Sequence, residues 1–186
     1  MQERDAVWFR PVWLGLLILI SAAITIAFTC VTPFAAFAVI AALTVPRRET
    51  VMLAVALWLT NQAVGFGLLH YPWTLSTFAW GVALGAGAVV GTLGALWIHR
   101  RLGSLPSLAR SVAAFVAAFV LYQLTLFAAA AAWLGGTEMF ATGIVSQVLV
   151  INAVTLVGLL ALQQVVAGAA LLIRRRRAHA SPARLA

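Results

Sequence analysis

The fold is decided by residues 12–45, VWLGLLILISAAITIAFTCVTPFAAFAVIAALTV, an unbroken apolar stretch of 34 residues. One helix of this length would extend about 51 Å, whereas the hydrocarbon core of a bilayer is about 30 Å thick. Arginines flank the stretch at Arg10 and at Arg47-Arg48. Since proline disfavours helical geometry in the residue before it, Cys30-Val-Thr-Pro33 is the natural break. The stretch therefore predicts a hairpin whose second arm, Phe34–Val45, is short and either tilted or partly re-entrant.

The arginines alternate with the apolar segments along the rest of the chain. All twelve cationic residues are arginines, and each precedes the first segment or lies in every second gap after it. The connections around residues 30–33, 70–76 and 135–140 contain no Lys or Arg. Cationic loops remain on the cytoplasmic side when a membrane protein inserts. The sequence therefore predicts an all-α polytopic membrane protein with six transmembrane helices and both termini in the cytoplasm.

The same pattern sets the predicted organisation. Residues 1–11 form a cytoplasmic N-terminus, residues 12–173 a six-helix membrane domain, and residues 174–186 a cytoplasmic basic tail. We expect the tail from Ala178 onward to be disordered, because it has little to bury. The expected location is the bacterial inner (cytoplasmic) membrane. After the hairpin, the predicted segments are residues 51–69, 77–98, 111–134 and 141–173.

Composition and charge exclude several classes of function. The chain is 64% hydrophobic and 9% charged. We interpret its net charge of +8 as a result of membrane topology, with the cations attracted to anionic lipid headgroups, and not as a sign of nucleic-acid binding. No acid or base lies inside a predicted segment, which argues against ion-coupled transport and intramembrane proteolysis. There is no lysine, and hence no nucleotide-binding loop of the common type. We expect no enzyme activity and no cofactor.

The most polar side chains inside the predicted segments are amides. They are biased toward the outer half of the membrane, and an unpaired amide costs several kcal/mol in hydrocarbon. These amides therefore contact each other, bound water or a ligand. Interhelical hydrogen bonds, at about 0.6 kcal/mol each, are one explanation. The amides in question are Asn61, Gln62, Gln123, Gln147 and Asn152.

The second explanation is a shared pocket for a large, mostly uncharged, hydrogen-bonding ligand. Aromatic residues in the outer loop and in the segments near it supply flat apolar walls, which are typical of ligand sites with a few orienting polar groups. The absence of charge within the segments disfavours a small ion as cargo. The residues that we expect to line this pocket are Asn61, Gln62, His70, Tyr71, Trp73, Trp80, Tyr122, Gln123, Glu138, Gln147 and Asn152.

Two further patterns involve metal ligands and small residues. His70 and Cys30 both lie on the outer side, but two ligands without a third do not predict a metal site. The fourth segment carries two G-x-x-x-G spacings, which permit close helix contact and favour packing inside the chain over dimerisation. The first segment contains Ala23-Ile-Thr-Ile-Ala27, an A-x-x-x-A spacing that gives a smooth helix face.

The chain resembles the S components, the substrate-binding membrane subunits, of energy-coupling factor vitamin transporters. The resemblance covers the whole chain: six segments in fewer than 200 residues, both ends inside, a short irregular second segment, and the small-residue motif on the first. The stretch Asn61-Gln-Ala-Val-Gly-Phe-Gly67, followed by His70-Tyr-Pro72, is also similar to proteobacterial S-component-like proteins proposed for cobalamin uptake. No residues of this chain form a clear cobalt-ligand motif.

The resemblance implies a partner and a site. Helix one of S components docks on the transmembrane coupling subunit, so Ala23 and Ala27 would form the docking face. An ATPase module would supply the energy, and a vitamin-like molecule would bind near the outer face. The alternative is a non-transport membrane accessory or assembly subunit whose small-residue faces bind other membrane helices. A metal-ion permease and a membrane enzyme are less favoured.

Overall fold

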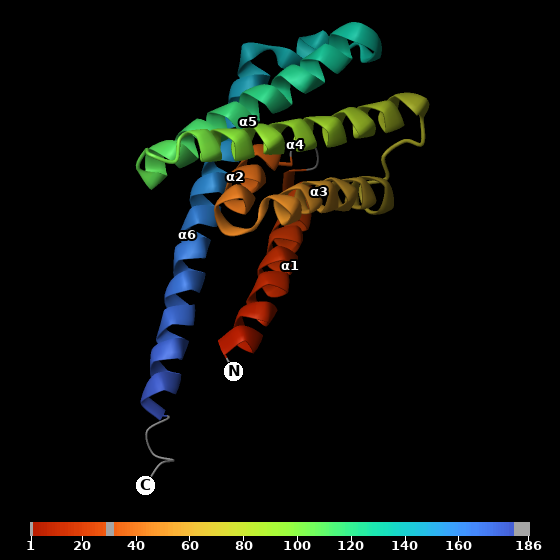
Figure 1. Cartoon of the computed structure of the whole chain (residues 1–186). Helices are drawn as coiled ribbons and strands as arrows, with labels where there is room; N and C mark the ends of the chain where they lie inside the picture. The colour runs from red at the N-terminus through yellow and green to blue at the C-terminus, as the bar shows by residue number, and fades with distance from the viewer. Residues whose placement is uncertain (1, 29–31, 181–186) are drawn as a thin grey trace.

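Figure 1 shows a computed structural model of the chain, which describes residues 2–28 and 32–180, with side chains for residues 10–28 and 32–169. Every regular element in these residues is helical, and none is a strand. The long helices are α1 (Gln2–Phe28), α3 (Arg47–Gly67), α4 (Leu75–Arg101), α5 (Ser107–Ala129) and α6 (Thr142–Ala180). The shorter elements are α2 (Phe34–Thr44), a π-helical turn (Ala130–Leu134) and a 3-10 helix (Thr137–Phe140).

Five of the described helices are long and apolar enough to cross a membrane, and α2 is too short to do so by length alone. The predicted fold class, an all-α multi-pass membrane protein, is confirmed. Helix length supports five crossings, and counting α2 would make six. The predicted orientation of the termini stays a prediction.

The short helix α2 lies in the interior of the bundle. All nine residues from Phe34 to Ala42 are buried, and α3, α4, α5 and α6 pack around it. Its 11 residues extend about 16 Å, roughly half of the hydrocarbon core. An element of this length is tolerated at membrane depth because neighbouring helices, rather than lipid, surround it.

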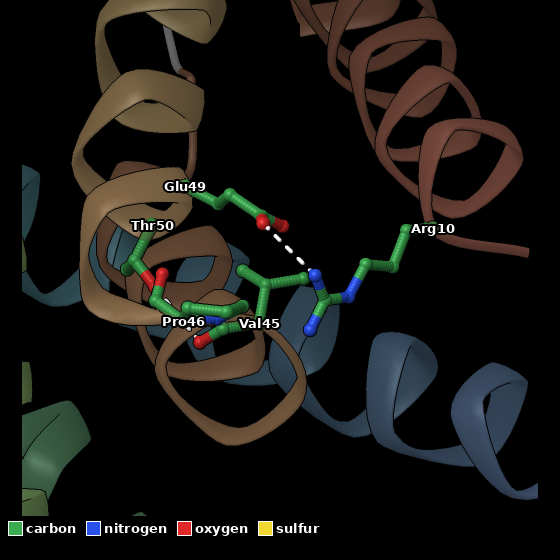
Figure 2. A network of polar contacts seen from close by, with 5 residues as sticks. All are labelled: Arg10, Val45, Pro46, Glu49 and Thr50. Carbon is green, nitrogen blue, oxygen red and sulfur yellow. Dashed lines mark hydrogen bonds and ion pairs between the residues drawn. The ribbon is translucent and has the colours of Figure 1, made fainter. Parts of the chain in front are cut away.

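Two polar contacts place the start of α1 beside the end of α2 and the start of α3. Among the described residues, α1 packs mainly against α3 and not along α2, so the two arms of the predicted hairpin are not packed together. The indole of Trp13, near the start of the apolar part of α1, donates a hydrogen bond of 3.2 Å to Thr44 Oγ1 at the end of α2. Arg10 forms an ion pair of 3.2 Å with Glu49 in the first turn of α3 (Figure 2). Arg10 and Glu49, at the two ends of the segment that contains α1 and α2, therefore lie at the same end of the bundle. Figure 1 also shows the start of α1 and the end of α6 on the same side of the molecule.

The ends of α1 and α6 differ from the predicted boundaries. Helix α1 begins at Gln2 rather than near Val12 and includes Pro11, and α6 continues to Ala180. The prediction of a disordered tail is therefore wrong for Ala178–Ala180, and residues 181–186 lie outside the described part of the chain. Arginine and alanine are strong helix formers, and they extend a helix that the apolar segment has already nucleated.

Glycines allow α4 to pack closely between α3 and α5. A Cβ atom on Gly85 would lie 2.7 Å from the indole of Trp58 on α3. A Cβ atom on Gly91 would lie 2.8 Å from the carbonyl oxygen of Ala118 on α5, and one on Gly87 would lie 3.0 Å from the ring of Tyr122. Packing inside the chain, which the two G-x-x-x-G spacings favoured over dimerisation, is confirmed.

Candidate functional site

One end of the bundle contains a partly open pocket of about 430 Å³. We call it the arginine-free end, because it contains the connections without arginine: the start of α2, the end of α3, the start of α4, the end of α5 and the start of α6. No lining residue carries a charge, so the walls offer hydrogen bonds and apolar contact only. The lining residues are Thr32, Phe34, Asn61, Tyr71, Trp80, Leu84, Tyr122, Gln123, Leu126, Met139, Phe140, Ile144 and Val148.

Five of the eleven predicted binding residues line this pocket: Asn61, Tyr71, Trp80, Tyr122 and Gln123. They come from α3, the α3–α4 connection, α4 and α5, which are separated by up to 62 positions in the sequence. The structure therefore brings together two amides and three aromatic rings around one space. Their role in binding a ligand stays a prediction.

Close backbone approach positions Tyr71 at the pocket. Its backbone N–H donates a hydrogen bond of 3.0 Å to the carbonyl of Gly65, and its ring lies against the same glycine. A Cβ atom on Gly65 would lie 2.5 Å from the Tyr71 ring, so a larger residue there would displace the ring. Tyr122 is buried, with its ring centroid 5.8 Å from that of Phe34. Glycine on α3 and an aromatic contact with α2 thus fix two of the walls.

A chain of hydrogen bonds runs from the pocket wall to α1. Gln62 Nε2 donates to Asn61 Oδ1 at 3.1 Å, and Asn61 Nδ2 donates to Thr32 Oγ1 at 2.6 Å. Thr25 Oγ1 donates to the Ser21 carbonyl at 2.9 Å, so Thr32 donates the 3.0 Å bond that joins the two threonine hydroxyls. Every bond in the chain then points in one direction. The network holds the pocket-lining Asn61 and Thr32 against α1.

The loop between α5 and α6 covers the pocket. The π-helical turn Ala130–Leu134 ends α5, and Gly135 and Gly136 follow with φ angles of 71° and 80°. Only glycine adopts this left-handed region without strain, and the turn sends the chain back over the bundle. Phe140 then lines the pocket and packs edge-on against Phe127, with 5.3 Å between ring centroids.

Four predicted residues lie near the pocket but do not line it, because their side chains point outward. His70, Trp73, Glu138 and Gln147 are all exposed. Trp73 instead belongs to an aromatic cluster with Phe66 and Phe78, where ring centroids are 4.9 to 5.8 Å apart. Exposed aromatic clusters at segment ends suit the membrane interface.

Two other predicted residues are at least partly buried but lie outside the lining. Gln62 bonds to Asn61 and packs beside Gly81. Asn152 is 2% exposed and donates to the Val148 carbonyl, while its Oδ1 atom is buried without a partner among the described residues. These two amides therefore make contacts inside the protein and do not line the pocket.

The sequence prediction missed eight lining residues, and helical spacing would have found two of them. Leu84 follows Trp80 by four positions, and Leu126 follows Tyr122 by four, so each shares a helix face with a predicted residue. The remaining six, Thr32, Phe34, Met139, Phe140, Ile144 and Val148, come from connections and from the starts of α2 and α6. Their sequence carried no signal that distinguishes them from ordinary membrane-segment residues.

The other candidates concern metal and partner binding. Among the described residues, no group of three or more His, Cys, Asp or Glu side chains is arranged to hold a metal ion. Cys30 lies outside the described residues. Ala23 and Ala27 are exposed on α1, where a partner helix would reach them.

Comparison of the chain with family models, with curated proteins and with solved structures finds no match. The proposed function therefore rests on the fold class and on the geometry of the pocket.

Proposed function

We propose that this chain is a substrate-binding subunit of a transporter in the bacterial inner membrane, for a vitamin-like small molecule. The observation that carries the proposal is the uncharged pocket at the arginine-free end. Asn61 and Gln123 offer amide donors and acceptors there, and five aromatic rings offer flat apolar surfaces. This combination suits a ring-containing ligand with polar substituents.

The size of the pocket narrows the class of ligand. Its volume of about 430 Å³ equals that of about 14 waters at roughly 30 Å³ each, and it falls in the usual range for small-molecule sites. A compact ligand of one or two rings fits this space. A corrinoid, with a four-ring macrocycle and a nucleotide side arm, is larger than this space. The geometry thus favours a compact vitamin over cobalamin.

The exposed face of α1 supports the association with a partner that transport requires. Only 22% of the membrane-spanning window of α1 is buried, and Ala23 and Ala27 lie on its exposed side. Small residues let another helix approach closely. Under this proposal, energy-coupling factor transmembrane and ATPase subunits dock there, and the hydrogen bonds from Asn61 to Thr25 link the docking helix to the pocket.

Isothermal titration of the purified chain against water-soluble vitamins, from single-ring compounds to cobalamin, tests the proposal. We expect wild-type protein to bind one compact member of the panel. Gln123→Leu should weaken binding by about 1–3 kcal/mol, because the ligand's polar group is left unpaired. Gln147→Leu removes an exposed amide at the same end and should bind like wild type. No binding by folded wild-type protein, or equal binding by both variants, would reject the substrate pocket.

The accessory-subunit alternative is favoured by one separate observation. Only 17% of the membrane-spanning window of α6 is buried, which is less than for the other long helices. Such a helix has a large apolar surface for other membrane helices. If the vitamin panel gives no binding while the chain co-purifies with membrane partners, this second function replaces the first.

A further inference from the structure

The opposite end of the bundle carries a second hollow, a groove of about 550 Å³. We call this the arginine-bearing end. The groove runs along the last third of α4, between the start of α3 and the middle of α5. Arg47 and Arg100 contribute to its lining, and the rest of the lining is apolar. It is distinct from the candidate substrate pocket, because the two share no lining residue.

The groove is open to the surroundings of the bundle. The apolar side chains of Val90, Leu93 and Trp97 are 38%, 40% and 58% exposed, so in a membrane they face lipid. Gly94, which has no side chain, lets Leu121 of α5 pack directly against α4, and both residues line the groove. The groove is therefore an apolar channel on the lipid-facing surface.

The charges are all at one end of this channel. Val90 lies ten positions before Arg100, or about 15 Å along α4, which is half of a hydrocarbon core of about 30 Å. The apolar part of the groove thus has the length of one leaflet, and the two arginines lie where that leaflet's headgroups begin. Arg101 adds a third cation nearby, with its guanidinium 5.7 Å from the Trp97 ring.

The arginines at the groove are available for a ligand. Among the described side chains, neither Arg47 nor Arg100 has an ion-pair or hydrogen-bond partner, whereas Arg10 pairs with Glu49. A planar guanidinium binds phosphate oxygens in a bidentate manner. We infer that the groove binds one anionic glycerophospholipid, with its phosphate at Arg47 and Arg100 and an acyl chain along Val90, Leu93 and Trp97. This site goes beyond the proposed substrate function and does not depend on it.

Native mass spectrometry of the detergent-purified chain, titrated with phosphatidylglycerol, tests this inference. We expect wild type to bind the first phosphatidylglycerol more tightly than a phosphatidylcholine with the same acyl chains. Arg47→Gln/Arg100→Gln should weaken that binding about thirtyfold, since each cation near an anionic headgroup contributes about a fivefold factor. The matched control Arg48→Gln/Arg110→Gln removes the same charge outside the groove lining and should keep wild-type affinity.

A second variant separates the acyl chain from the headgroup. Leu93→Trp keeps both arginines and fills the groove, so it should also lower the affinity for phosphatidylglycerol while leaving the melting temperature unchanged. Equal loss in the two double-arginine variants would overturn the site, because it would reduce the effect to general surface charge. Competition by glycerol 3-phosphate as strong as that by phosphatidylglycerol would also overturn it, since the apolar groove would then play no part.

Discussion

The two ends of the bundle hold hollows of similar size and different chemistry. At the arginine-free end, a pocket of about 430 Å³ lies among the helices, with buried Asn61 and Tyr122 in its walls. At the arginine-bearing end, a groove of about 550 Å³ lies on the outside of α4, with exposed Leu93 and Trp97 along it. An uncharged pocket with buried polar groups in its walls selects a ligand by shape and hydrogen bonds, whereas an apolar groove with cations at one end selects an amphiphile.

Helix α4 contributes to both hollows, as do α3 and α5, and its small residues pack it against these neighbours. The first half of α4 provides Trp80 and Leu84 to the pocket, and the second half provides the wall of the groove from Val90 to Arg100. Near the middle of α4, Gly87 and Gly91 pack it directly on α5. The α4–α5 contact is the most extensive of all helix pairs in the described structure. This glycine seam therefore sets the geometry of both hollows.

The largest expected effect concerns the orientation of the two ends. Reporter fusions after Trp73 and after Glu138 should show an external location, and those after Arg101 and Arg177 a cytoplasmic one, because cationic loops stay inside. The result is all-or-none at each position. A cytoplasmic reporter at Trp73 would reverse the orientation of the two ends and place the candidate substrate pocket on the inner side of the membrane.

The next effect tests whether the glycine seam supports both ends. Gly91→Ala adds a methyl group 2.8 Å from the Ala118 carbonyl oxygen, so the helices must separate. We expect a loss of stability of about 1–3 kcal/mol, as for overpacked cores, and weaker binding at both hollows. Thermal unfolding in detergent measures it. The matched control is Gly158→Ala on α6, where nothing lies within 4 Å of the added atom and helix propensity improves. Equal melting temperatures for the two variants would show that the seam tolerates movement.

The sequence predicted the boundaries from the α1–α2 break to the start of α6 within a few residues, because they depend on strong local signals, whereas α1 and α6 extend beyond their predicted outer ends. The segment predicted for residues 77–98 corresponds to α4, Leu75–Arg101, and the break near Pro33 separates α1 from α2. Prolines and arginines end apolar segments at the membrane surface regardless of tertiary contacts. What the sequence could not reveal is that α2 is surrounded on all sides, since an apolar helix looks the same whether lipid or protein covers it.

The sequence indicated how far along each helix the pocket residues lie, but not which side chains point into the pocket. Gln147 and Val148 are neighbours at nearly the same depth on α6, yet only Val148 lines the pocket. Successive residues of an α-helix are turned by about 100°, so one position decides between the pocket and the outer surface. Hydropathy gives the depth of a residue, whereas its direction depends on how each helix is rotated in the bundle. That rotation is set by packing such as the contact between Trp58 and Gly85.

The smallest expected effect concerns the ion pair at the arginine-bearing end. Glu49 accepts a bond from Arg10 and also lies in the first turn of α3, where a negative charge favours the helix dipole (Figure 2). Arg10→Gln removes only the pair, which is 56% exposed on the arginine side and is worth about 0–1 kcal/mol. Glu49→Gln removes the pair and the dipole interaction, so its melting temperature should fall further than that of Arg10→Gln. Both differences should shrink at high salt, because exposed charges are screened. If Arg10→Gln destabilises more than Glu49→Gln, Arg10 has a role besides this pair. The contrast with Arg47 and Arg100, which have no partner among the described side chains, would then no longer hold.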